Sequence, residues 1–224
     1  MEIDEFKGMN PKYNVLYFGN KYDVRLIPKN CSTTIKILWC YLNGFNIRHD
    51  ENNPHGVIPD DAVTQTRRKT RVIENGNKTF RGGAKKVTVK RDPIERWVSA
   101  INFCIKMRDH RGSVRDYAEF SKLKWVDMNI NDVVSYQQEN GPMVAELLSQ
   151  SYCGGDLDKY SHVYTKETFS QFIDLLDKEF NTKFPRVVST RTDHNGKWKI
   201  EDLTEESIVK LKEIYEVDYR LGWY

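Results

Sequence analysis

The chain has few cysteines and no long apolar run. Its 224 residues include four scattered cysteines and no CxxC pair, which excludes a disulfide framework and gives no zinc-site pattern. The longest apolar-leaning stretch, residues 35–42, is far shorter than the roughly 20 residues that a membrane span needs. Residues 1–5 are acidic and lack the apolar segment of a signal peptide. We therefore expect a cytoplasmic protein without a membrane partner.

The chain also lacks internal repeats, low-complexity tracts and a linker rich in Pro, Gly or Ser. Hydrophobic residues make up 39% of it and charged residues 30%, a balance that excludes disorder, collagen and coiled coil. A chain of this length usually folds as one domain, so we expect a single domain over residues 1–224. No pattern indicates an oligomeric state.

The total charge is nearly balanced, yet the basic residues are concentrated in one segment. The chain has 35 Lys and Arg against 32 Asp and Glu, a net charge of +3. Residues 67–91 contain ten basic residues and one acidic residue, so this segment carries +9 and the other 199 residues carry −6. A local excess of positive charge predicts an anionic partner.

Short strands alternate with amphipathic helices along the chain. Alternating or apolar stretches predict strands at residues 23–27, 85–90 and 160–165. Helical periodicity is found in six places: 32–42, 60–73, a stretch from 93, short helices within 113–150, 166–180 and a stretch from 202 or 204. This alternation predicts an α/β fold, with a central, mainly parallel sheet flanked by helices.

The segment Ile27–Thr34 predicts a strand end, a tight turn and a helix capped by Ser32 or Thr33. The N-terminus of a helix binds phosphate-like anions through its exposed N–H groups and its dipole. Lys29 adds a full positive charge at the turn. The Walker A pattern is absent. An ordinary capped helix after a strand would have the same local pattern.

A second segment, residues 89–100, combines a strand end with the start of a helix at Pro93. An arginine at a strand end, here Arg91, can bind a phosphate with two hydrogen bonds, and Ser99 in the helix can add another. Asp92 either orients Arg91 or caps the helix. Alternatively, Arg91 and Arg96 are surface residues held in ion pairs.

Taken together, these two segments resemble the sulfotransferase superfamily. The motif Pro-Lys-x-x-Ser-Thr begins at Pro28, and Arg-Asp-Pro-x-x-Arg-x-x-Ser begins at Arg91, about sixty residues later. The carbohydrate sulfotransferases of the HNK-1 and chondroitin types are the most similar, because a polar loop with a His, here residues 47–51, lies between the motifs. The tail from Leu203 to Tyr219 resembles the closing helix of the family. The resemblance implies a P-loop-like sulfotransferase fold.

The resemblance implies roles for the residues of both motifs. The family uses 3′-phosphoadenosine 5′-phosphosulfate (PAPS) as sulfuryl donor and needs no metal. The first motif would bind the 5′-phosphosulfate, and its residues here are Lys29, Asn30, Cys31, Ser32, Thr33 and Thr34. The second would bind the 3′-phosphate through Arg91 and Ser99. A late basic loop often covers the nucleotide in this family, which makes Arg191 and Lys197 further candidates.

Sulfuryl transfer needs an in-line acceptor, a stabilised leaving group and a general base. Lys29 would stabilise the charge on the leaving phosphate. His49 matches the loop His of the family and is our candidate base, while His55 and Glu51 in the same loop are alternatives. The acceptor, a small molecule or glycan, can be an alcohol or an amine.

The basic cluster Arg67, Arg68 and Arg71 matches no cofactor motif. It lies between the candidate base and the second motif, so it faces either an anionic acceptor or solvent. Two other functions compete with sulfuryl transfer. One is a P-loop-type nucleotide kinase, which the missing Walker glycines disfavour. The other is a polyanion- or nucleic-acid-binding module using residues 67–91, where Phe80 alone could stack on a base.

Overall fold

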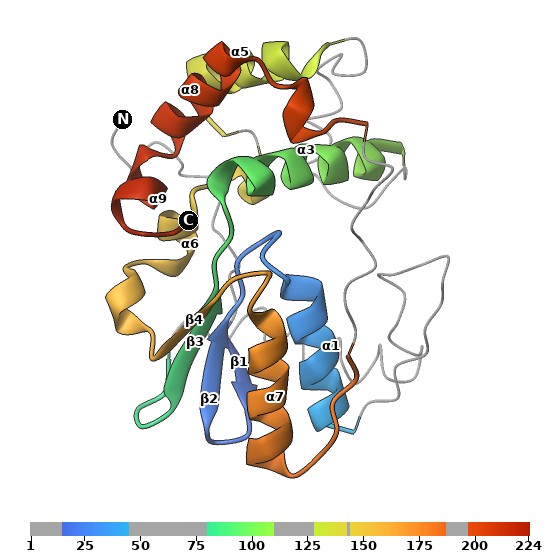
Figure 1. The fold of residues 1–224 in the computed structure, drawn as a ribbon, viewed down its shortest axis with the longest axis vertical. Coiled ribbons are helices and arrows are strands. Elements are labelled where there is room, and N and C mark those ends of the chain that lie inside the picture. Colours follow the sequence, from blue (N-terminus) through green and yellow to red (C-terminus); the bar gives the residue numbers. More distant parts are fainter. Residues whose placement is uncertain (1–14, 45–79, 110–127, 143, 187–196) are drawn as a thin grey trace. The chain divides into compact units, whose positions relative to one another are not determined.

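The computed structural model describes residues 15–44, 80–109, 128–142, 144–186 and 197–224 (Figure 1). The chain divides into two compact units. The sheet unit holds all the described residues up to Lys90 and from Asp158 to Arg186, and the helical unit holds the remainder. The expectation of one domain over the whole chain stays a prediction. In the described ranges, no helix has the length and apolar character to cross a membrane.

The sheet unit is built on a four-stranded sheet in the order β1-β2-β3-β4. The strands are β1 (Val15–Phe18), β2 (Tyr22–Arg25), β3 (Lys85–Val89) and β4 (His162–Tyr164). β1 runs antiparallel to β2, and the pairs β2–β3 and β3–β4 are parallel. The predicted α/β class with a mainly parallel sheet is therefore confirmed. β1 is an addition, because its pattern of largely buried residues in four positions gives no alternating signal.

The strand predicted at residues 23–27 is correct in place but not in its end. β2 stops at Arg25, although Leu26 and Ile27 remain buried. The apolar pattern is therefore longer than the strand, because both residues pack in the interior although they lie beyond the hydrogen-bonded ladder. The β2–β3 register sets Val24 opposite Val87, and both side chains are fully buried.

Two helices of the sheet unit, α1 (Ser32–Leu42) and α7 (Phe169–Phe180), lie side by side against the sheet (Figure 1). Their buried residues form one apolar core with Val24, Val87 and Val89 of the strands. The predicted helix at 166–180 is too long at its start. Residues Thr165 and Thr168 exchange hydrogen bonds between their hydroxyls and main-chain N–H groups, which forms a turn before the helix.

The helical unit contains most of the remaining helices. Its elements are α3 (Pro93–Asp109), α5 (Ile130–Asn140), η2 (Ala145–Leu147), α6 (Gln150–Gly154), η4 (Ile200–Asp202), α8 (Glu205–Ile214) and α9 (Glu216–Arg220), while η3 (Leu157–Lys159) lies at the boundary of the units. The core of this unit includes Trp97, Val134, Leu211 and Tyr215. The helix predicted from Pro93 and the short helices in the middle of the chain are confirmed where the structure describes them.

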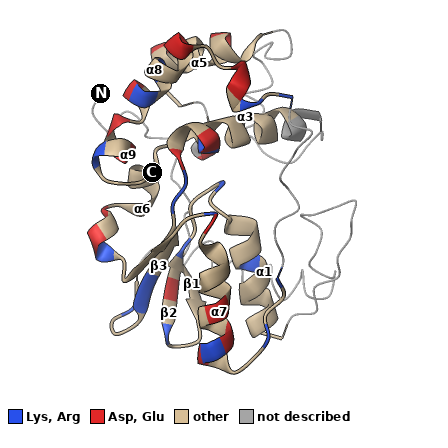
Figure 2. Ribbon diagram, viewed as in Figure 1, with Lys and Arg blue, Asp and Glu red and all other residues tan. Residues whose placement is uncertain are grey.

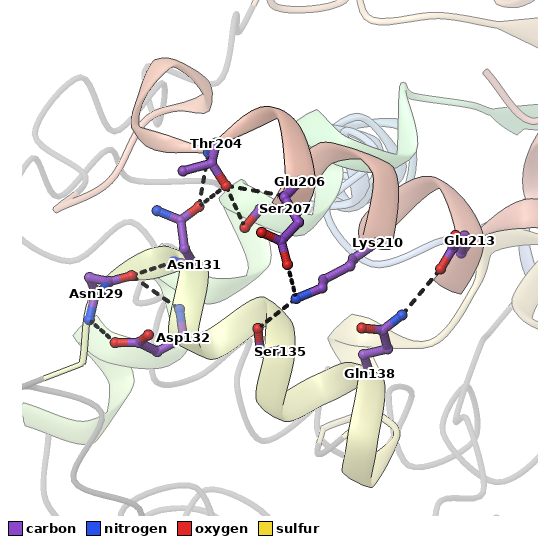
Figure 3. Close-up of polar contacts among 10 residues, drawn as sticks. All are labelled: Asn129, Asn131, Asp132, Ser135, Gln138, Thr204, Glu206, Ser207, Lys210 and Glu213. Carbon is purple, nitrogen blue, oxygen red and sulfur yellow. Dashed lines mark hydrogen bonds and ion pairs between the residues drawn. The ribbon is translucent and has the colours of Figure 1, made fainter.

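α8 packs beside α5 and is tied to it by polar side chains (Figure 3). Thr204 caps α8 by accepting the N–H of Ser207 over 3.2 Å, which confirms one of the two predicted helix starts. Asn131 of α5 accepts a hydrogen bond of 2.9 Å from the N–H of Thr204. Lys210 reaches Ser135 over 3.2 Å and forms an ion pair with Glu206 over 2.7 Å. The closing helix is thereby held on α5 at its start and its middle.

Candidate functional site

The turn before α1 has an unusual backbone. Lys29 and Cys31 have φ angles of 67° and 55°, although neither residue is glycine. A left-handed conformation costs roughly 1–2 kcal/mol for a residue with a Cβ. Such strain persists only where neighbouring contacts impose it, and it is found most often at functional sites.

Asn30, between these two residues, anchors the turn to the sheet. Its side chain is 1% exposed, and its Nδ2 donates to the main-chain oxygen of Val89 over 2.8 Å. Its own N–H donates to the oxygen of Ile27 over 3.1 Å. Asn30 therefore holds the backbone in place, while Lys29 on the same turn stays only half-buried.

The helix start differs from the predicted one. Cys31, rather than Ser32 or Thr33, is the residue before the first turn of α1, and its side chain does not cap the helix. The reason is the left-handed turn, which brings Ser32 into the first helical position. The first main-chain bond back along α1 runs from Ile35 N to Cys31 O over 3.0 Å. The N–H groups of Ser32, Thr33 and Thr34 precede that bond, as is general at a helix start.

The three hydroxyls of this helix start are not equivalent. Ser32 and Thr33 are half-buried, whereas Thr34 is 2% exposed and lies in the interior. The first turn of α1 contains no acidic residue, so no carboxylate there competes with a bound anion for the N–H groups. The turn can therefore offer main-chain N–H groups, two accessible hydroxyls and the Lys29 ammonium to a phosphate or sulfate group.

The second segment, in the helical unit, begins at Arg91. The Nε of Arg91 lies 3.2 Å from Glu95 Oε2, and the two side chains are 20% and 40% exposed. Glu95 and Ser99 are four residues apart in α3, so they share one face of the helix. The ion pair therefore places the Arg91 guanidinium over the face of α3 that also carries the half-buried Ser99.

Asp92 caps α3, which is one of the two roles predicted for it. Its Oδ1 accepts the N–H groups of Ile94 and Glu95, both over 2.9 Å. The alternative of two surface arginines is wrong for Arg96, whose side chain is 0% exposed. Its Nη2 donates to the oxygen of Glu146 over 2.9 Å. Arg96 therefore serves the packing of the helical unit and cannot reach a ligand at the surface.

Gln150 is a residue of this site that the sequence did not reveal. Its Oε1 accepts the N–H of Arg91 over 3.1 Å, and its Nε2 donates to the oxygen of Arg91 over 2.7 Å. The two residues are 59 positions apart, and an isolated glutamine in a short helix carries no sequence signal for such a contact.

Lys197, predicted in a late basic loop, lies beside α3 because its neighbour is anchored there. Asn102 of α3 accepts the N–H of Trp198 over 3.1 Å and donates to its oxygen over 2.8 Å. Asn102 follows Ser99 by three residues and so lies on a neighbouring part of the helix surface. The Lys197 ammonium lies 4.7 Å from the Trp198 ring centroid. Sequence alone gave no sign of the Asn102 contact.

The basic segment serves several purposes within the described residues. Figure 2 shows basic residues at the start of β3 and between β3 and α3. Arg81 binds the buried carboxylate of Asp23 through its Nε and Nη2, and its guanidinium lies 4.0 Å from the Tyr17 ring centroid. Lys85 and Lys86 lie 5.7 Å and 5.3 Å from aromatic ring centroids. Part of the charge excess therefore stabilises the sheet unit itself.

Several predicted site residues lie outside the described ranges. These are the three base candidates and four arginines: His49, Glu51, His55, Arg67, Arg68, Arg71 and Arg191. Their roles stay predictions. Among the described candidates, the structure gathers residues 29–34 at one turn of the sheet unit, and Arg91, Ser99 and Lys197 along α3 of the helical unit.

Comparison with known proteins agrees with the two motifs. The family model described as “Sulfotransferase family” matches residues 9–222, which includes Lys29, Arg91 and the closing helix α8. No curated protein and no solved structure matches the chain. Because the family model covers nearly the whole length, the match does not depend on one short motif. The chain belongs to the sulfotransferase family.

Proposed function

We propose that this sulfotransferase takes its sulfuryl group from PAPS and transfers it to a hydroxyl of a carbohydrate. The observation that carries the proposal is the turn before α1, where two left-handed, non-glycine residues flank the buried Asn30. That geometry presents Lys29 and the start of α1 together. Family membership supports sulfuryl transfer, and the turn supports a donor that carries a phosphosulfate.

In this proposal, the 5′-phosphosulfate binds at residues 29–34. The N–H groups at the start of α1 and the hydroxyls of Ser32 and Thr33 donate to its oxygens. Asn30 and Thr34 act from the interior, because both side chains are buried. Cys31 contributes its left-handed backbone. Lys29 stabilises the negative charge that develops on the leaving phosphate.

The 3′-phosphate binds to Arg91 and Ser99, which lie along one face of α3. Glu95 holds the Arg91 guanidinium over this face until the phosphate takes its place. Lys197 adds positive charge beside α3, and we assign Arg191 as a further contact with the nucleotide. The 3′-phosphate then distinguishes the donor from ATP and ADP, which carry no phosphate at that position.

The chemical step is an in-line displacement at sulfur. The acceptor oxygen attacks the sulfur atom, and the bond from sulfur to the bridging phosphate oxygen breaks. The electron pair of that bond leaves with 3′-phosphoadenosine 5′-phosphate (PAP). The acceptor proton passes to a general base, for which we propose His49, with His55 and Glu51 as alternatives. Lys29 supplies the electrostatic stabilisation, and the step requires no metal.

The acceptor is proposed to be a glycan, because the loop at residues 47–51 resembles that of the HNK-1 and chondroitin types. Arg67, Arg68 and Arg71 would bind an anionic group of this acceptor. The kinase and polyanion-binding alternatives have less support than sulfuryl transfer. The family match spans both motifs, and Arg81 of the basic segment is bound to Asp23.

The proposal is tested by transfer of labelled sulfate from PAPS to a panel of glycans. Lys29→Gly removes the charge and tolerates the φ of 67°. We expect kcat to fall about 100-fold or more, as for loss of one group that stabilises a developing anion. Lys178→Ala, an exposed lysine of α7, is the matched control and should leave kcat unchanged. Normal turnover by Lys29→Gly would refute the role of Lys29.

The base is tested by His49→Ala and His55→Ala, with PAPS binding measured separately. His49→Ala should bind PAPS normally and turn over about 100-fold more slowly, within the usual range for a general base. If His49→Ala turns over normally and His55→Ala does not, the base is His55.

A further inference from the structure

Gln150 binds both main-chain groups of Arg91 with one side chain. It is the first residue of α6 and is 0% exposed. Its Oε1 accepts the N–H of Arg91 over 3.1 Å, while its Nε2 donates to the Arg91 oxygen over 2.7 Å. The amide thus pairs with Arg91 as a neighbouring strand would pair with it.

This pairing occurs where regular structure ends. The hydrogen bonds of β3 to its neighbour finish at Lys90, whose N–H donates to Tyr164 O over 2.8 Å. The first bond of α3 runs from Arg96 N to Asp92 O over 2.9 Å. Arg91 lies between the strand and the helix, and the following Pro93 has no N–H. Gln150 therefore fixes the main chain of Arg91 at the junction between the strand and the helix.

Gln150 is itself firmly held. Its N–H donates to Asp218 Oδ2 over 2.8 Å, and the N–H of Ser151 donates to Oδ1 over 2.7 Å. The Asp218 carboxylate is 0% exposed, so these charge-assisted bonds act in a medium of low dielectric constant. Gln150 Nε2 also donates to Trp223 O over 2.8 Å. The C-terminal residues thus fix the amide that fixes Arg91.

We infer that Gln150 is a positioning residue for Arg91 and so determines the preference for a 3′-phosphate. The inference rests on the proposed function, in which Arg91 binds that phosphate. A guanidinium binds phosphate well only when its planar donors meet two oxygens at the correct angle. The direction in which the Arg91 side chain leaves the backbone is set by the two main-chain groups that Gln150 binds.

The test compares the affinity for PAP with that for 5′-AMP, which lacks the 3′-phosphate. Gln150→Met keeps a similar volume but loses the hydrogen bonds to Arg91. We expect PAP affinity to fall about tenfold, the size typical of one well-aligned charged contact, while AMP affinity changes less than about twofold. Gln150→Glu, which keeps the acceptor for the Arg91 N–H but loses the donor, is the second variant and should also lose PAP preference.

Gln137→Met is the matched control. Gln137 is a buried glutamine of the same unit, 1% exposed, whose amide binds Trp97 and Tyr215 and not Arg91. It should lower stability, as Gln150→Met does, yet leave the ratio of PAP to AMP affinity unchanged. A merely structural role for Gln150 predicts that the two variants behave alike, and that result would overturn the inference.

Arg91→Ala separates failure of the inference from failure of the proposed function. If the wild type prefers PAP and Arg91→Ala loses that preference, the proposed phosphate site stands. The double variant Arg91→Ala with Gln150→Met should then bind PAP no more weakly than Arg91→Ala alone. Additive losses would refute the action of Gln150 through Arg91. A wild type without any PAP preference would refute the proposed function itself.

Discussion

The side-chain amide of Asn30 donates a hydrogen bond of 2.8 Å to the main-chain oxygen of Val89, the last residue of β3. The turn before α1 is thereby tied to a neighbouring strand, and the two left-handed residues on either side of Asn30 keep their conformation. Asn30 anchors the turn, and the adjacent Lys29 supplies its positive charge. Substitutions at the two positions can therefore separate the effect on stability from the effect on catalysis.

Asn30→Ala should destabilise the protein by about 1–3 kcal/mol, because it leaves the buried Val89 oxygen without its donor. Urea denaturation measures the change. Asn140→Ala is the control, since Asn140 makes a similar bond of 2.9 Å to Tyr136 O on an exposed surface. It should change stability by less than about 0.5 kcal/mol. Equal losses in the two variants would show that the buried bond has no special role.

The sequence predicted the parts of this site that depend on neighbours along the chain. Residues 28–34 and 91–99 were recognised because a turn, a charge and a helix start adjoin one another. The contacts of Gln150 and Asn102 were not, because each joins a side chain to a main chain 59 or 96 residues away. An amide that binds a distant backbone leaves no periodicity or spacing in the sequence.

The same distinction explains the errors in the fold. The alternative in which Arg96 is a surface residue in an ion pair is the common one for an isolated arginine, yet it is wrong here because the side chain is buried. Its acceptor, the oxygen of Glu146, comes from a segment 50 residues away. The predicted cap of α1 is wrong for a local reason. The sequence Lys-Asn-Cys contains no glycine, so it does not predict two residues in the left-handed conformation.

Glu95→Gln should strengthen PAP binding, because the carboxylate holds the guanidinium that we assign to the 3′-phosphate. We expect about a twofold to fivefold gain at low salt, in keeping with a partly exposed ion pair, and a smaller gain at high salt. Titration calorimetry at two salt concentrations measures it. Glu139→Gln, an exposed glutamate of α5, should have no effect. Weaker binding by Glu95→Gln would contradict the proposal that Glu95 and the 3′-phosphate compete for the Arg91 guanidinium.

Asp23→Ala should destabilise the sheet unit by about 3 kcal/mol, because it leaves the Arg81 guanidinium without its buried partner. PAP affinity of the folded protein should be unchanged, since this part of the basic segment serves the fold. Denaturation and calorimetry on the same preparation test both statements. A selective loss of PAP affinity without loss of stability would instead show that Arg81 and Asp23 contribute to ligand binding.

Tyr215 makes the stability of the protein depend on pH in the alkaline range. Burial raises the pKa of its phenol to about 12, against about 10 in the unfolded chain. The folded state therefore keeps its proton longer, and this contribution to stability is present below about pH 10 and is lost as the pH rises toward 12. Tyr215→Phe has no such proton, so its stability should fall less steeply above pH 10.

At pH 7 the same variant should be less stable by about 1–3 kcal/mol. In the wild type, Tyr215 Oη donates to Leu147 O over 2.7 Å and accepts from Gln137 Nε2 over 3.3 Å, and the variant loses both hydrogen bonds. Thermal denaturation between pH 7 and 11 gives both results. Parallel stability curves for the two proteins would contradict the assignment of the alkaline loss to Tyr215.

The measurement that tests the central proposal most directly is a thermal shift with PAP and, separately, with ATP. At 100 times its dissociation constant, PAP should raise the Tm of the wild type by about 5–10 °C for a chain of this size. ATP at the same concentration should raise it little, because it lacks the phosphate assigned to Arg91 and Ser99. No shift with PAP, or an equal shift with ATP, would contradict a PAPS-dependent sulfotransferase.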